Sequence, residues 1–152
     1  MFAFLERYRD VAIPHRGLGQ IELTCRLNAG IAKAEIPLDT PEQLRELWLR
    51  TSGGSLLVDQ ALGICGLTLH GPVEAKWRCR ERAESGYEVS ESDWLIGEFV
   101  GDTDMLVIDV DGAVLISTGS YRRSDWYRFG SLSAVLHRYV EENAEKYWEF
   151  DA

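Results

Sequence analysis

Two Asp-x-Asp pairs near the middle of the chain are the residues whose types and spacing come closest to a catalytic or metal-binding pattern. The pairs are Asp102 with Asp104 and Asp109 with Asp111, in the stretch GEFVGDTDMLVIDVDG. Carboxylates at this spacing can hold a metal ion, transfer protons, or occupy tight turns between strands. The apolar run between the pairs is typical of a strand, which at about 3.3 Å per residue spans roughly 15–20 Å. The two pairs are therefore too far apart to share one ion, and each alone is more typical of a turn.

The other residues able to do chemistry match no known site pattern. Placing Gly112 at position 6 of an EF-hand loop puts Val107 and Thr118 at positions 1 and 12, where a calcium loop needs acids. The three histidines are scattered and have no partner at metal-ligand spacing. Glu98 alternates with apolar neighbours, which favours an edge strand or a solvent-facing strand over the alternative of a carboxylate with a perturbed pKa. We expect no catalytic residue, no metal and no cofactor.

The charge of the chain is concentrated in one segment. The net charge is −9, from 25 acids and 16 bases, and neither Lys nor Arg occurs between Arg82 and Arg122. Nine acids lie in this interval, so the remainder of the chain is neutral. Such a segment repels nucleic acid and can steer a basic partner, although a solvated acidic surface that aids solubility accounts for it equally well. The nine acids are Glu84, Glu88, Glu91, Asp93, Glu98, Asp102, Asp104, Asp109 and Asp111.

Length and composition indicate a single soluble domain over residues 1–152. No run of eighteen apolar residues occurs, so no membrane-spanning helix is expected, and the four apolar residues at the start are too few for a signal peptide. Cys25, Cys65 and Cys79 show no Cys-x-x-Cys spacing. We therefore expect small buried thiols in a cytoplasmic protein.

Hydrophobic periodicity predicts helices at both ends of the chain. The clearest helix covers residues 41–51, with Thr40 and Gln43 as a capping box and Gly53 and Gly54 ending it. Residues 20–34 indicate a weaker helix, and the first dozen residues another short one. A charged helix is expected over 72–84, because Pro72 suits a first turn. The last helix follows the cap Ser131, with Glu142 and Lys146 as an i, i+4 pair.

Short apolar runs separated by turn residues predict an antiparallel meander in the middle. Asp111-Gly112 between two such runs is a strong hairpin signal. The prediction is an α+β domain, with a central antiparallel sheet, N-terminal helices and a C-terminal helix packed on it. The predicted strands are residues 55–58, 63–70, 94–100, 105–110, 113–118 and 125–129.

Five tryptophans are many for 152 residues. Trp48 lies on the apolar stripe of a predicted helix and is expected in the core. Trp77, Trp94, Trp126 and Trp148 suit either the core or a partner surface, where tryptophan often anchors binding.

The order of these motifs resembles the SUKH superfamily, the Smi/Knr-like proteins. The similar segments cover about residues 30–145 and read LRELWLRTSGG, LGICGLTLHGP, DWLIGEFVGDTDMLVIDVDGAV and DWYRFGSLSAVLHRYVE. The resemblance implies a binding module rather than an enzyme. Most bacterial members are similar to immunity proteins that neutralise a cognate toxin, often a nuclease. The structural signature that it carries over is Gly53, Gly54, Trp94, Gly97, Gly101, Asp102, Asp104 and Gly112.

Three hypotheses follow for function. The first is a cytoplasmic immunity protein that binds a basic cognate toxin, with neither nucleic acid nor membrane as partner and an undetermined oligomeric state. The second is a regulatory scaffold for an endogenous cytosolic partner, and the third a small metal-dependent hydrolase that uses the acidic loops. The residues predicted to contact a partner are Glu88, Glu91, Asp93, Glu98, Asp102, Asp104, Asp111, Trp94 and Trp126.

Overall fold

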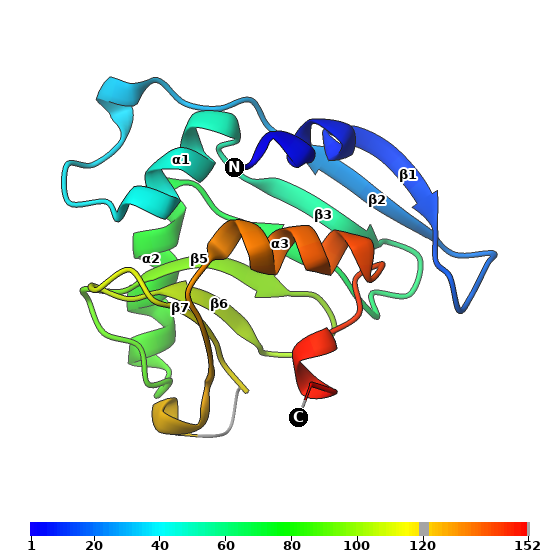
Figure 1. Ribbon diagram of the computed structural model, residues 1–152. Coiled ribbons are helices and arrows are strands. Elements are labelled where there is room, and N and C mark those ends of the chain that lie inside the picture. Colours follow the sequence, from blue (N-terminus) through cyan, green and yellow to red (C-terminus); the bar gives the residue numbers. More distant parts are fainter. Residues whose placement is uncertain (119–121, 152) are drawn as a thin grey trace.

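The chain folds around one antiparallel sheet whose strands follow one another in sequence order. The computed structural model describes residues 1–118 and 122–151. Within these residues the sheet has eight strands in the order β1 to β8, and each pairs antiparallel with the next (Figure 1). The strands are β1 Asp10–Pro14, β2 Glu22–Leu27, β3 Gly54–Asp59, β4 Leu67–Leu69, β5 Trp94–Phe99, β6 Met105–Ile108, β7 Val114–Ile116 and β8 Tyr127–Phe129.

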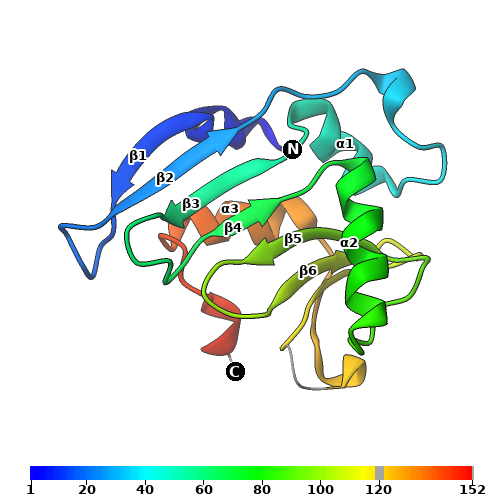
Figure 2. The same ribbon diagram turned by 180° about the vertical axis from the view of Figure 1, so that it is seen from behind.

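Helices cover both faces of this sheet, so the predicted α+β class is confirmed. Helices α1 (Glu42–Arg50) and α3 (Leu132–Glu141) lie on one face, whereas α2 (Pro72–Glu84) lies on the other (Figures 1 and 2). Seen from the α2 side, β1 to β3 have no helix over them (Figure 2). The described residues also contain short 3-10 helices: η1 Ala3–Tyr8, η2 Lys33–Glu35, η3 Arg123–Asp125 and η4 Tyr147–Glu149.

Each face of the sheet has its own apolar core. The larger core lies beneath α1 and α3, where Trp48 meets Trp94 edge to face at 5.6 Å. The smaller core lies beneath α2 and includes Cys79, Leu95 and Val107. Burying one Leu, Val or Met side chain contributes about 1.5–3 kcal/mol. Because β5 to β7 lie between the two cores, they are apolar on both faces and appear in the sequence as continuous apolar runs.

The helix predicted over residues 20–34 is wrong, because this part of the chain forms strand β2. Leu23, Cys25 and Leu27 are buried and alternate with more exposed residues, which is the period of a strand that covers one core. The short helix expected in the first dozen residues is present as η1, and β1 follows it.

The predicted capping box of α1 is also wrong. The helix begins after Pro41, and the Oγ1 atom of Thr40 is buried without a hydrogen-bond partner in the described residues. Gln43 instead donates to the carbonyl oxygens of Gly112 and Gly130, at 3.3 and 3.0 Å, and accepts from the backbone N–H of Leu132 at 2.7 Å. This side chain therefore ties α1 to the β6–β7 turn and to the start of α3.

The other helix signals agree with the structure in part. Helix α2 has the predicted bounds, and Ser131 caps α3 by accepting from Ala134 N. Helix α1 ends at Arg50 with Thr51 as its C-cap, so Gly53 and Gly54 do not end it; their φ angles of +117° and +130° occur at the start of β3. A Cβ atom on Gly54 would lie 2.1 Å from the carbonyl oxygen of Arg26, so glycine is needed there for strand approach.

Candidate partner-binding surface

The nine acids of the central segment do not form a continuous acidic surface. Five of them form ion pairs within the chain. The electrostatic attraction that they can exert on a basic partner is therefore weaker than the sequence predicts. The cations come from α2, from residues after position 121 and from the C-terminal segment, which the fold brings to the acidic segment. The pairs are Asp93 with Arg123, Glu98 with Arg82, Asp102 and Asp104 with Lys146, and Asp109 with Arg128.

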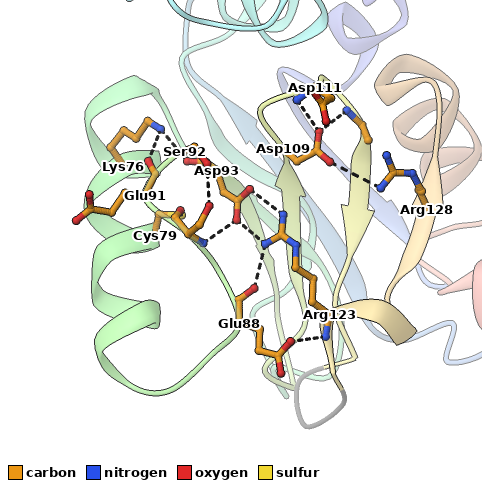
Figure 3. Close-up of polar contacts among 12 residues, drawn as sticks. Lys76, Cys79, Glu88, Glu91, Ser92, Asp93, Asp109, Asp111, Arg123 and Arg128 are labelled. Atoms are coloured by element: carbon orange, nitrogen blue, oxygen red, sulfur yellow. Dashed lines mark hydrogen bonds and ion pairs between the residues drawn. The ribbon is translucent and has the colours of Figure 1, made fainter.

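The pair with the most buried carboxylate joins the loop after α2 to the segment before β8. Asp93 is 1% exposed and accepts from Nη1 and Nη2 of Arg123, at 2.5 and 2.8 Å, and from the backbone N–H of Ser90 at 2.8 Å (Figure 3). The Asp93 carboxylate also raises the pKa of the Arg123 guanidinium. Arg123 further donates to the carbonyl oxygen of Glu88 at 3.0 Å. Loop 85–93 is therefore anchored at both Glu88 and Asp93.

The Asp-x-Asp pairs act as turn formers, as predicted. Oδ1 of Asp102 accepts from the backbone N–H of Asp104, and Oδ1 of Asp109 accepts from the N–H groups of Asp111 and Ala113. Asp111 is exposed at the tip of the β6–β7 turn. No group of three or more potential metal ligands occurs in residues 1–118 and 122–151.

Lys146 has a different partner from the one predicted. Helix α3 ends at Glu141, and the Nζ atom of Lys146 contacts Asp102 and lies 2.7 Å from Oδ2 of Asp104. The expected helical pair with Glu142 is therefore wrong, and Lys146 instead fastens the C-terminal segment to the β5–β6 turn.

Glu98 lies in the interior of the sheet rather than on an edge, since β5 has a neighbour on each side. Its carboxylate lies 3.7 Å from Nε2 of His70 and 3.5 Å from Nε of Arg82, beneath α2. The Arg82 contact fits an ion pair, and both distances exceed those of ordinary hydrogen bonds. The neighbouring His70 and then Arg82 lower the pKa of Glu98 against the opposing effect of burial.

The structure places the predicted contact residues in three environments. Asp93, Trp94 and Trp126 are buried, so their side chains are not offered to a partner of the folded chain. Trp94 packs against Trp48, with the Nζ atom of Lys76 3.9 Å from its ring centroid. The remaining six stay predicted contacts: Glu98 and Asp104 are partly buried, and Glu88, Glu91, Asp102 and Asp111 are exposed.

Three exposed acids remain without an ion pair to any described cation around the C-terminal end of α2. They are Glu84 on the helix and Glu88 and Glu91 on the following loop. Glu84 and Glu91 line a shallow pocket of about 500 Å³ together with Lys76, Cys79, Arg80 and Ala83. We call the outer side of α2 with loop 85–93 the α2 surface.

Two other pocket residues are engaged within the chain. Lys76 donates to the carbonyl oxygens of Glu91 and Asp93, at 3.0 and 2.8 Å, which holds the loop against the helix (Figure 3). The Cys79 thiol donates to the carbonyl oxygen of Ser90. Burial, followed by the nearby Asp93, raises the pKa of Cys79 to about 11, so this thiol is neutral at pH 7 and a poor nucleophile. The pocket therefore suits contact with a partner better than covalent chemistry.

Sequence reasoning left the most exposed tryptophan undecided. Trp77 is 49% exposed on the outer side of α2, directly after the pocket residue Lys76 and three residues before the pocket residue Arg80. The signal that points to it is helical spacing, because Ala75 and Cys79 face the sheet and Trp77 lies between them on the opposite side.

Comparisons of the chain with models of protein families, with curated proteins and with solved structures found no match. No helix in the described part of the chain has both the length and the apolar character needed to cross a membrane.

Proposed function

We propose that this chain is a cytoplasmic, non-enzymatic protein-binding module of the SUKH type, which neutralises a basic cognate toxin by binding it directly. The resemblance of the segments around LRELWLRTSGG and DWLIGEFVGDTDMLVIDVDGAV to that superfamily supplies the functional class. The observation that carries the proposal is the group of Glu84, Glu88 and Glu91, which are exposed, unpaired with described cations and mounted on a firmly anchored loop and helix.

The geometry supports a role in recognition for these acids. Most other carboxylates of the central segment are neutralised within the chain, so the negative charge left on the α2 surface is local. Charges at the rim of an interface chiefly raise the association rate and set partner choice. A basic toxin surface would therefore be attracted to this end of α2, and the attraction would weaken as salt is added.

Growth protection tests this function. The gene beside that of this chain is expressed from an inducible promoter, with and without the chain. We expect growth to stop without the chain and to be restored with it. A neighbouring product that is harmless, or a toxic one whose effect the chain does not relieve, contradicts the proposal and favours the scaffold hypothesis.

Charge reversal at two glutamates tests whether the toxin is attracted to the α2 surface. Glu84→Lys with Glu91→Lys is compared with Glu22→Lys and Glu35→Lys, which change the net charge equally at other exposed glutamates. We expect the first pair to slow association with the purified toxin about tenfold at low salt, and the control pair to slow it much less. Equal slowing by both pairs would show that net charge, rather than the α2 surface, directs encounter.

A further inference from the structure

The outer side of α2 carries a stripe of four residues spaced as one helix face. Val73, Trp77, Arg80 and Glu84 follow one another at intervals of four, three and four residues, so they line up along the helix. They lie opposite Ala75 and Cys79, which are buried against the sheet. Val73 is 85% exposed and Trp77 49% exposed.

This stripe differs from the other exposed apolar side chains. Most of these, such as Leu38, Leu62 and Val110, lie outside helices and strands, where single exposed apolar residues are ordinary. On α2, Val73 and Trp77 lie one turn apart on a regular helix, and the charged residues Arg80 and Glu84 follow them along the same face. Tryptophan is also among the residue types enriched at the positions that dominate binding energy.

The indole of Trp77 is restricted by one contact within the chain before any partner arrives. The Arg78 guanidinium lies 5.4 Å from the Trp77 ring centroid. Arg78 is itself fixed by Glu74 at 3.0 Å and by Glu81 at 3.3 Å. A side chain that is already ordered loses less conformational entropy on docking, and more of its contact energy appears as affinity.

The helix under the stripe is also fastened to the rest of the chain from its second turn to its C-terminal end. Lys76 bonds to the loop carbonyls beside Trp94, and Arg82 reaches Glu98 on β5. Cys79 and Ala83 pack in the smaller core. A partner therefore meets a preformed surface rather than one that must fold on binding.

Charge at the end of the stripe defines the chemistry of the occupant. Glu84 closes the stripe and, with Glu91, lines the adjoining pocket, and neither has an ion-pair partner in residues 1–118 and 122–151. Arg80, between Trp77 and Glu84, is exposed and would meet an acceptor on the partner. The complement is an apolar hollow with lysine or arginine side chains opposite Glu84 and Glu91 and an acceptor opposite Arg80.

We propose that α2 is the docking helix of this protein, with Trp77 inserted into an apolar hollow on a basic protein partner and Glu84 and Glu91 paired with that partner's rim. This assignment rests on the proposed function, since it names the face through which the toxin is bound. It predicts that one side chain, Trp77, accounts for a large part of the affinity.

The test measures the dissociation constant between the purified chain and the product of the neighbouring gene. Trp77→Ala is compared with Leu38→Ala, which truncates an apolar side chain that is 97% exposed elsewhere. We expect Trp77→Ala to weaken binding at least about 30-fold and Leu38→Ala to stay within about twofold of the wild-type value. Unchanged thermal unfolding of both variants shows that the fold is intact.

The possible outcomes separate the two proposals. Failure of the wild-type chain to bind removes the proposed function and this docking face with it. Tight wild-type binding that Trp77→Ala leaves unchanged overturns the docking face alone. Sedimentation of the chain by itself as a dimer that Trp77→Ala dissociates also overturns it, because a second copy would then cover the stripe.

Discussion

Arg123→Met is expected to destabilise the fold strongly, because it leaves a buried carboxylate with one donor in place of three. Asp93 is 1% exposed and would keep only the bond from Ser90. Removing one partner of a buried ion pair costs about 3–5 kcal/mol. The Arg123 side chain is 31% exposed, so solvent can reach the gap, and the expected loss falls to about 2–3 kcal/mol.

Urea unfolding at pH 7 measures this loss. With a slope of about 2 kcal/mol per molar, the midpoint should fall by about 1–1.5 M. Arg122→Met is the matched control, since Arg122 is the adjacent residue, is exposed and has no ion pair with the described residues. It should change stability by no more than about 0.5 kcal/mol.

A double-mutant cycle separates the pair from the rest of the side chain. Asp93→Asn removes the charge from the other partner, and the combined variant should be less destabilised than the sum of the two single changes by about 1.5 kcal/mol or more. An Arg123→Met protein as stable as wild type, or a cycle that closes with no coupling, would refute the role given to this pair.

Three further predictions concern contacts that join distant parts of the chain. Lys146→Met should lower the free energy of unfolding by about 1–2 kcal/mol in urea, because two carboxylates of the β5–β6 turn lose their cation; equal stability would contradict this. Gln43→Ala should cost about 1–3 kcal/mol in the same assay, whereas Thr40→Ala should be close to neutral, the reverse of what a capping box requires. The pKa of Glu98 is lowered in the folded chain, so its ionised carboxylate stabilises the fold at pH values above its unfolded pKa. This stabilisation is lost as pH falls through the folded pKa. The stability advantage of wild type over Glu98→Gln should therefore be largest near pH 7 and shrink below about pH 4.3, and an advantage that grows on acidification would reverse the assigned sign.

The elements fixed by local signals were predictable from the sequence. Helix α2 was predicted with its correct bounds from Pro72 and the charged residues after it. Proline fits a first helical turn, so this signal is local and does not depend on contacts with distant residues. Strands β5 to β7 were equally clear, since residues buried on both faces form unbroken apolar runs.

The misjudged elements depend on partners far away in the chain. Strand β2 has only three buried residues, and its pairing with β1 and β3 overrides a weak local helical pattern. Gln43 matches a capping-box pattern but bonds to residues beyond position 110, which no local pattern reveals.

The candidate surface was predictable only in part, because its charge is a local feature of the sequence whereas its ion pairs join distant residues. The excess of acids between Arg82 and Arg122 is visible in the sequence, but their neutralisation by Arg123, Arg128 and Lys146 requires the fold. Exposure likewise separates Trp77 from the four other tryptophans, which share its residue type but are buried.

The most direct test of the central claim is titration of the neighbouring gene product's toxic activity with the purified chain. Direct neutralisation predicts that the activity falls in proportion to added chain and is abolished near one equivalent, with Trp77→Ala requiring a large excess. Full activity of that product in a tenfold excess of the wild-type chain would contradict the account.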